Sequence, residues 1–397
     1  MSQTDNKLPI LISGAGIAGL TAALCLASKG FQVEIYEREE KLDPIGAGIQ
    51  ISPNAFRVLE DIGLGDELSS SGMFPDAIKV HDGTKGHLVT SIPLGQVIRK
   101  KFGSPYCVIH RADLQSILLD RCLSNSLIKI HFGSEVSDFR TDGASINADI
   151  SSKNGKVQIE GSVLVAADGI WSKLRTNALQ LPAPKYSGKI AWRAMLPVSD
   201  VENTELMRNT HLWLAPRSHI VTYPVTNGQF LNLIVITDEP NFESLPVSAE
   251  CHGNFQRKLS GTCKELSTLF DLVTEWSAWP IFQTPPPLRM DFGRVAIIGD
   301  AAHAALPFAA QGAAMAIEDA VILAHYLAKQ PAVDGMKMFE QSRIGRIQRV
   351  LKLSETNGRI YHMQSPLSAL RNTVMKLMPG EMLLGRQAWI YDWRAEN

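Results

Sequence analysis

The segment of residues 10–38 constrains the fold of this chain more than any other part. A short apolar run, Ile10 to Ser13, suits a buried parallel strand, and three glycines follow it in GxGxxG spacing: Gly14, Gly16 and Gly19. An Ala- and Leu-rich stretch comes next, and a second apolar run then ends at Glu37. This order predicts a strand, a tight turn, a helix and a second parallel strand, which is the unit that binds a dinucleotide.

Each part of this unit has a physical role in binding a pyrophosphate. Gly14 permits the tight turn, Gly16 lets backbone N–H groups approach the phosphates, and Gly19 lets helix and strand pack closely. The helix N-terminus favours negative charge. Glu37 can accept hydrogen bonds from ribose hydroxyls and would repel a 2′-phosphate. Four further residues complete the predicted site around this unit: Ile17, Ala18, Arg38 and Gly48. This unit alone does not distinguish an NAD-binding site from an FAD-binding site.

The composition narrows the class of protein. The chain has 397 residues and a formal net charge of −1 without a long basic run, so we expect no nucleic-acid partner. Its five cysteines are scattered and form no CxxC pair, which fits a reducing, cytoplasmic location. The opening residues MSQTDNKLPI lack the apolar run of a signal peptide, and no stretch suits a membrane span. We expect a soluble monomer or homodimer.

The spacing of apolar residues divides the chain into alternating segments. Period-2 runs near 78–92 and throughout 189–237 predict an antiparallel sheet, and short apolar runs at 163–167 and 295–298 predict further parallel strands. Residues 42–54 are predicted to form a loop and 55–68 a helix.

The predicted fold is therefore α/β with mixed α+β character. A Rossmann-like dinucleotide-binding domain is built from residues 1–75, 106–180 and 286–345. An antiparallel-sheet substrate domain, built from 76–105 and 181–285, is inserted into it, and C-terminal helices occupy 346–397.

Two more motifs follow strands of the predicted parallel sheet. They are ADGIWSKLR at 167–175 and RVAIIGDAAHAALPFAAQGAAMAIEDA at 294–320. With the glycine turn, these motifs resemble the flavoprotein hydroxylases with a single FAD-binding domain, the group A flavoprotein monooxygenases that include salicylate hydroxylase. The resemblance covers nearly the whole chain and makes FAD the expected dinucleotide.

In that family the Asp of the GD motif holds the ribityl hydroxyls of FAD, which implies this role for Asp300 after Gly299. The following loop would lie beside the isoalloxazine ring, with Pro307 on the face of that ring. The resemblance also implies FAD contacts or supporting roles for a larger set: Arg111, Asp168, Gly169, Arg175, Gln311, Gly312, Ala313 and Ala314. Ala310 stands where the family often has Gly, and because its methyl group restricts φ, we expect a slightly different loop there.

The β-rich region supplies the candidate substrate pocket. His219, Val221 and Tyr223 alternate onto one face of a predicted strand, and similar His and Tyr positions in the family serve to deprotonate a substrate phenol. His219, Tyr223 and Pro307 are therefore the predicted catalytic residues. The predicted substrate-binding residues are Trp192, Arg193, Met195 and His303, with Arg193 suited to a carboxylate. No metal site is expected.

The resemblance implies an FAD-dependent monooxygenase that uses NAD(P)H and O₂ to hydroxylate a small aromatic substrate through a flavin C4a-hydroperoxide. A hydroxybenzoate is the expected substrate, as in salicylate hydroxylase, where the carboxyl group leaves as CO₂. Only one GxGxxG unit is found, so NADH or NADPH is expected to bind transiently. The alternatives are a hydroxylase of a quinone precursor or of a nitrogen heterocycle such as hydroxynicotinate or urate, and a non-catalytic FAD-binding escort protein.

Overall fold

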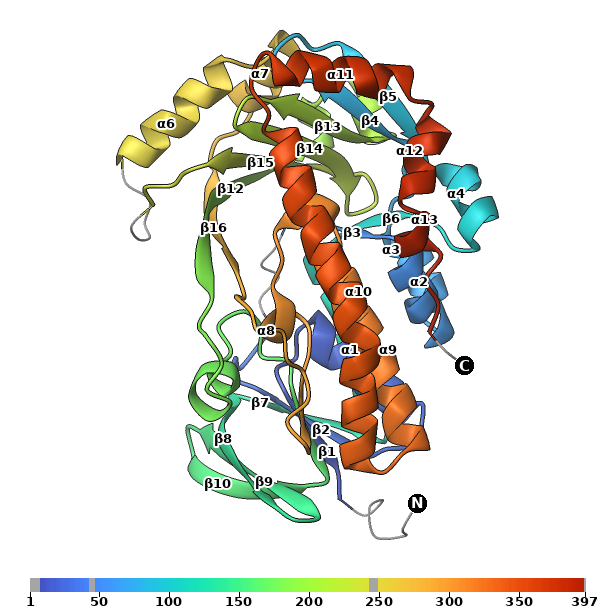
Figure 1. The fold of residues 1–397 in the computed structure, drawn as a ribbon, viewed down its shortest axis with the longest axis vertical. Helices are drawn as coiled ribbons and strands as arrows, with labels where there is room; N and C mark the ends of the chain where they lie inside the picture. Colours follow the sequence, from blue (N-terminus) through green and yellow to red (C-terminus); the bar gives the residue numbers. More distant parts are fainter. Residues whose placement is uncertain (1–7, 43–46, 243–248, 396–397) are drawn as a thin grey trace.

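The structure is a computed structural model that describes residues 8–42, 47–242 and 249–395. Figure 1 shows a parallel sheet and a larger antiparallel sheet near opposite ends of the molecule, with the long helix α10 (Ala332–Tyr361) running between them. Among the described residues, no helix combines the length and apolar character needed to cross a bilayer. The predicted mixed α/β fold is confirmed.

The parallel sheet has five strands in the order β17-β11-β1-β2-β7. Their bounds are β1 Ile10–Ser13, β2 Val33–Glu37, β7 Ile128–Phe132, β11 Val163–Ala166 and β17 Val295–Ile297. Helices α1 (Ile17–Ala27), α5 (Arg111–Leu123) and α9 (Gly312–Lys329) contribute buried apolar residues to the core around this sheet. The carboxyl ends of β1, β11 and β17 lead into the three sequence motifs, so parallel pairing brings these motifs to one edge.

The antiparallel sheet has seven strands in the order β16-β12-β15-β14-β13-β4-β5. Their bounds are β4 Ala77–Asp82, β5 Leu88–Pro93, β12 Lys185–Pro197, β13 Thr210–Ala215, β14 Ser218–Val225, β15 Phe230–Asp238 and β16 Ser277–Gln283. Strands from segments 76–105 and 181–285 thus form one sheet, in which β4 and β13 pair in parallel. Helices α6 (Ala249–Ser260) and α7 (Lys264–Asp271) carry apolar residues of the core on one of its faces.

Smaller elements complete the chain. A three-stranded sheet joins β8 (Ser134–Asp142), β9 (Ser145–Ser152) and β10 (Gly155–Gly161), and β3 (Gly48–Ile51) pairs with β6 (Cys107–His110). The short helices are α2 Pro53–Asp61, α3 Gly65–Ser71, α4 Gly95–Phe102, α8 Asp300–His303, α11 Leu367–Leu377, α12 Gly380–Arg386 and α13 Ala388–Tyr391. Short turns of helix lie at Leu174–Ala178 (η1), Val198–Asp200 (η2), Thr204–Met207 (η3) and Pro307–Ala309 (η4).

Three boundaries differ from the sequence-based expectations. Residues 48–51 form strand β3 rather than a loop, while residues 43–46 of the expected loop lie outside the described part. The expected helix over 55–68 is two helices, since Gly63 adopts a φ of +82° between α2 and α3. The predicted boundary at residue 345 falls inside α10, which is continuous over 30 residues.

Candidate active site

The glycine turn between β1 and α1 forms one wall of a cavity. Gly14 has a φ of +98°, and a Cβ atom there would lie 2.7 Å from the carbonyl oxygen of Ala167 at the end of β11. A Cβ atom at Gly19 would lie 2.0 Å from the carbonyl oxygen of Gly14, so helix α1 packs directly on the turn. Gly16, which caps α1, has no neighbour within 4 Å of the same position. The turn therefore presents bare backbone to a ligand at Gly16.

Glu37 organises this turn as well as facing the cavity. Its carboxylate accepts a hydrogen bond from the backbone N–H of Ala15 (2.7 Å) and another from that of Glu39 (3.0 Å). Glu37 lines a cavity of about 390 Å³ together with Gly14, Gly16 and Arg38. The carboxylate at the end of β2 thus fixes the glycine turn from inside, a role that the sequence did not reveal.

Asp168 lies on the opposite side of the same cavity. Its Oδ1 atom is buried and has no hydrogen-bond partner, and burial raises the pKa of the carboxyl group. A buried acceptor without a partner is rare in folded proteins and marks a place where a ligand or water donates a hydrogen bond. This orphaned oxygen, the open backbone at Gly16 and the acid at Glu37 fit the polar half of a dinucleotide.

A second cavity of about 410 Å³ meets the first, since Gly16, Ala167 and Gly169 line both. It extends from the parallel sheet to the face of the antiparallel sheet. The predicted cofactor residues that line it are Gly16, Ile17, Ala18, Gly48, Arg111, Gly169, Asp300, Pro307, Gly312 and Ala313. Asp300 is exposed at the start of α8, and Gly312, which begins α9, has no neighbour within 4 Å of a Cβ position.

Five predicted cofactor residues do not line either cavity: Gly19, Arg175, Gly299, Gln311 and Ala314. Their roles are structural. Arg175 is buried and donates to the carbonyl oxygens of Pro182 (3.0 Å) and Ala301 (3.0 Å), so it ties η1 to α8. Gly299 adopts a φ of +60° and a Cβ atom there would lie 3.0 Å from that of Ala18, so only glycine fits where α8 meets α1. Ala314 is fully buried in α9.

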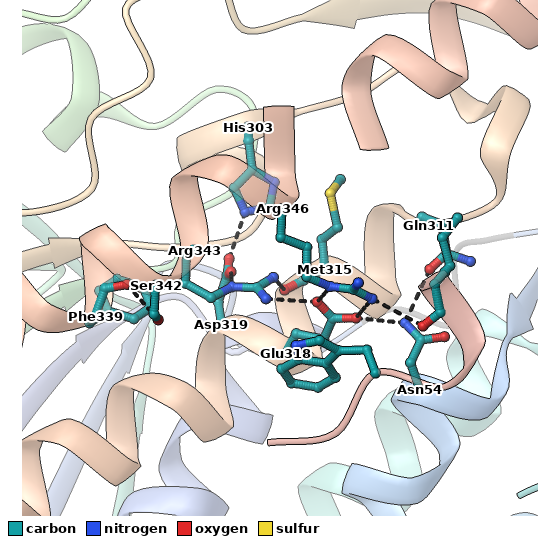
Figure 2. Close-up of polar contacts among 12 residues, drawn as sticks. Asn54, His303, Gln311, Met315, Glu318, Asp319, Phe339, Ser342, Arg343 and Arg346 are labelled. Atoms are coloured by element: carbon teal, nitrogen blue, oxygen red, sulfur yellow. Dashed lines mark hydrogen bonds and ion pairs between the residues drawn. The ribbon is translucent and has the colours of Figure 1, made fainter. Parts of the chain in front are cut away.

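Gln311 belongs to a buried polar network that anchors the start of α9 (Figure 2). Its amide donates to Ser52 Oγ (2.9 Å) and accepts from the Nδ2 of Asn54 (3.2 Å). Asn54 Nδ2 also donates to Glu318 (2.6 Å), one of the two acids that the motif places together on α9. The side-chain amide of Gln311 therefore forms its hydrogen bonds with protein groups rather than with a ligand.

The two acids at the centre of Figure 2 pair with arginines of α10. Glu318 accepts from Arg343 (2.7 Å) and Arg346 (2.7 Å), and Asp319 accepts from Arg343 (2.8 Å) and from His303 Nε2 (2.6 Å). Burial raises the pKa of both acids, but the arginines and His303 outweigh it and hold each pKa below its ordinary value. This network fixes the loop between α8 and α9 against α10.

Ala310 adopts the left-handed region with φ +50° and ψ +39° at the end of η4. A methyl group makes this conformation unfavourable by roughly 1–2 kcal/mol. The position where the family often carries Gly therefore needs a glycine-like backbone here too, and the surrounding loop keeps the alanine in it.

The antiparallel sheet supplies the other wall of the second cavity. Arg193, His219, Val221 and Tyr223 line it from β12 and β14. The Arg193 Nε atom is buried without a hydrogen-bond partner, and its guanidinium lies 5.3 Å from the ring centroid of Trp279. Asp300 is the one acid among the described residues that line this cavity, whereas Arg111 and Arg193 are both cationic. The cavity therefore has an unsatisfied positive group.

His219 and Tyr223 differ in their protonation. Burial, with smaller contributions from His362 and Lys189, lowers the pKa of His219 well below 6.5, so this imidazole is neutral at pH 7. Burial raises the pKa of Tyr223 far above 10, although Arg193 and Gln50 oppose it, so the phenol keeps its proton. His219 thus has one ring nitrogen free to act as an acceptor, and Tyr223 has a proton with which to donate a hydrogen bond.

The structure corrects three of the predicted substrate contacts. Trp192 points to the opposite face of the sheet from Arg193, where its ring stacks on Phe255 with centroids 4.1 Å apart. His303 is buried against Asp319 and lies outside the second cavity. Met195 shares the face of Arg193 but packs into the cluster around Tyr223 and does not line the cavity either.

A family model described as "FAD binding domain" matches residues 7–352. The chain belongs to this family. The 3-hydroxybenzoate 6-hydroxylase of Polaromonas naphthalenivorans is 32% identical over 399 residues, which span all of this chain and 99% of that protein. The predicted family is confirmed: the protein is an FAD-dependent aromatic hydroxylase, which excludes a non-catalytic escort.

Solved structures agree on the fold. HpxO of Klebsiella pneumoniae in complex with FAD and uric acid has a TM-score of 0.86 over 98% of both chains, at 22% identity. A salicylate hydroxylase solved as a substrate complex has a TM-score of 0.81 over 98% of this chain and 96% of that chain, at 23% identity. Asp168, Glu37 and the bare glycine turn give this flavoprotein a site whose donors, acceptors and open backbone fit FAD.

Proposed function

We propose that this FAD-dependent enzyme hydroxylates a hydroxybenzoate, with NADH or NADPH as reductant and O₂ as oxidant. One oxygen atom enters the ring, the other leaves as water, and NAD(P)H supplies the two electrons. FAD, when bound, supplies the redox chemistry that activates O₂. The protein's own residues bind the aromatic acid, orient it and remove its phenolic proton.

The observation that carries this proposal is Arg193 Nε, which is buried without a partner at the cavity wall. A buried cationic N–H group without an acceptor is costly unless a ligand supplies one. A carboxylate matches the planar fork of Arg with two parallel hydrogen bonds. Burial and the nearby Arg111 lower the pKa of Arg193, which is the direction expected for a cation that lacks its counter-ion.

The phenolic half of the substrate is supported by His219 and Tyr223. A neutral imidazole can take the proton of a phenol, which raises electron density at the ring carbons ortho and para to the oxygen. In 3-hydroxybenzoate the para carbon is C6, the position named in the relative from Polaromonas. Tyr223 keeps its proton and can donate a hydrogen bond to the same oxygen. We therefore place 3-hydroxybenzoate ahead of salicylate, whose hydroxylation would release CO₂.

FAD is expected to contact Gly16, Glu37 and Asp168 at its nucleotide end and Asp300, Pro307 and Gly312 at its flavin end. Cys25, Cys107, Cys122 and Cys263 are buried thiols that form no disulfide, which favours the reducing cytoplasm.

The test is NADH and NADPH oxidation by the purified holoenzyme, with O₂ uptake and product identification by mass spectrometry. The ligands are 3-hydroxybenzoate, salicylate, benzoate, which lacks the hydroxyl group, and 3-methylphenol, which lacks the carboxylate. We expect 3-hydroxybenzoate to yield 2,5-dihydroxybenzoate and the two truncated ligands to give little product. Hydroxylation of urate or 6-hydroxynicotinate but of no hydroxybenzoate would contradict the proposal.

A further inference from the structure

A chain of hydrogen bonds leads from the second cavity to the protein surface through His219. The Nδ1 atom of His219 lies 2.9 Å from the Nε2 atom of His362, the residue that follows α10. The Nδ1 atom of His362 lies 2.8 Å from Oδ1 of Asp238, at the end of β15. The side chains of both histidines are buried, whereas that of Asp238 is 30% exposed. This hydrogen-bond chain therefore connects the second cavity with a partly exposed carboxylate at the protein surface.

The ionised acid fixes where each proton lies in this chain. Burial raises the pKa of Asp238, but hydrogen bonds from His362 and Lys189 outweigh it and hold the value at about 2, so Asp238 is a carboxylate and only accepts. His362 must then carry its proton on Nδ1, which leaves Nε2 as an acceptor. His219 must in turn donate from Nδ1, and its Nε2 is left as the base that can face a ligand.

We propose that Asp238 and His362 hold His219 in the tautomer with a free Nε2 and conduct the phenolic proton of the substrate to solvent. This inference rests on the proposed phenolic substrate. The phenol O–H bond breaks as its proton binds His219 Nε2, and the Nδ1 proton of His219 passes to His362 Nε2. The products are a phenolate and an imidazolium of His362 paired with Asp238, whose partly exposed carboxylate passes the Nδ1 proton to water. When the phenolate of the product takes up a proton from His219 Nε2, the same transfers run in reverse and restore both starting tautomers.

The surroundings suit a proton path. The rings of Phe308 and Tyr361 flank His219 with centroids 5.2 Å and 5.4 Å away, which shields the imidazole from water. Lys189 forms an ion pair with Asp238, and Lys258 donates to the backbone carbonyl of Asp238 (2.7 Å) and pairs with Glu239. Burial lowers the pKa of His362, although the hydrogen bond to Asp238 opposes this, and a lowered pKa favours release of the proton.

Asp238→Asn is the direct test, because an amide can donate to His362 and reverse both tautomers. We expect kcat/KM for 3-hydroxybenzoate at pH 6.5 to fall about 10- to 100-fold, with KM nearly unchanged. The loss should shrink as the pH approaches about 10, where a phenol ionises without a base. His362→Gln should show the same loss of kcat/KM, again shrinking towards pH 10. It replaces Asp238→Asn as the test if that variant does not fold.

His211→Asn is the matched control. It breaks another buried histidine pair of the same sheet, in which His211 Nδ1 lies 3.1 Å from His81 Nε2, outside the second cavity. We expect its pH profile to match the unmodified enzyme. A pH-independent loss in Asp238→Asn, or an unchanged profile, would overturn the relay.

A readout without substrate separates this inference from the proposed function. In ¹⁵N-histidine-labelled holoenzyme at pH 7, we expect neutral His219 and His362 with the proton on Nδ1 in both, assigned by comparison with the single variants. Asp238→Asn should move the proton of each to Nε2. A proton on Nε2 of His219 in the unmodified enzyme would overturn the relay whatever the substrate is.

Discussion

The ring of Tyr223 lies directly against the backbone of Gly48. A Cβ atom at Gly48 would lie 2.3 Å from Cε2 of Tyr223, and the backbone N–H of Gly48 donates to Asn232 Oδ1 (2.9 Å). Strand β3 therefore seats the tyrosine in the cavity wall, although Gly48 and Tyr223 lie far apart in sequence.

Gly48→Ala should displace Tyr223 and impair turnover more than FAD binding. We expect a loss of about 1–3 kcal/mol in the free energy of unfolding, from overpacking, and a lower kcat with hydroxybenzoate. Urea denaturation and steady-state kinetics measure the two effects. Gly345→Ala in α10 is the control, because a Cβ there meets nothing within 4 Å and should stabilise the helix slightly. Equal kinetics for Gly48→Ala and the unmodified enzyme would contradict the role of this contact.

Arg193→Met should weaken binding of carboxylated ligands selectively. Because the variant loses a charge-assisted hydrogen bond to the carboxylate, we expect KM for 3-hydroxybenzoate to rise roughly 10- to 100-fold. The weak activity with 3-methylphenol, which has no carboxylate, should not change. Arg289→Met is the control, since its guanidinium also lies near an aromatic ring but lines neither cavity. An equal loss with both ligands would argue against a carboxylate contact.

Asp300→Ala and Tyr223→Phe should separate cofactor binding from turnover. Because a carboxylate can accept two hydroxyl hydrogen bonds, its removal should weaken FAD binding roughly 10- to 100-fold, measured by quenching of flavin fluorescence. Tyr223→Phe should keep its FAD and lose part of its hydroxylation rate. The opposite pattern in the two variants would reject both assignments.

Ala310→Gly should stabilise the protein, because Ala310 occupies the left-handed region. Removing the methyl group relieves that backbone strain, while the added glycine increases the entropy of the unfolded chain and partly offsets the gain. The free energy of unfolding should rise by about 0.5–1 kcal/mol. Ala369→Gly on the exposed face of α11 is the matched control and should lower it by a similar amount. A destabilised Ala310→Gly would show that the methyl group packs favourably.

The pair His81 and His211 should make the fold acid-sensitive. Burial lowers the pKa of each to about 4, while an unfolded histidine titrates near 6.5. Between these values the unfolded chain binds protons that the folded chain does not, so stability falls as the pH drops from 6.5 to 4. Urea midpoints of the unmodified protein should fall more steeply over this window than those of the double variant His81→Asn/His211→Asn. Parallel curves would refute the assignment.

The parallel sheet and its three motifs were predictable because their signals are local. An apolar run, a glycine turn and an acid stand next to one another in sequence, as at Gly14 and Asp300. Strand β3 was missed because its four residues lie within a Gly- and Pro-containing stretch, 42–54, and because its pairing partner β6 begins only at Cys107. His362 and Asp238 carry no local signal, since their contacts join residues 143 and 124 positions apart.

The assignment of Trp192 shows a different limit. Adjacent residues of a strand face opposite sides of a sheet, so Trp192 and Arg193 cannot line one cavity. Alternation alone does not say which side meets helices α6 and α7, and the packing of Trp192 on Phe255 decides it. His303 was misplaced because its partner Asp319 lies one helix further along the chain.

One continuous helix, α10, contacts both the loop at Phe308 and, through His362, the proposed base His219. Arg343 in the first half of α10 pairs with Asp319 of α9, Asn357 donates to the carbonyl of Phe308 (3.0 Å) further along, and His362 follows the C-terminal end. The rise of an α-helix places Arg343 and His362 roughly 28 Å apart along that axis. Because one continuous helix carries these contacts, we expect a displacement of His362 to be transmitted to the loop at Phe308. The residues beside the expected flavin position and the proposed proton path are therefore positioned by the same helix.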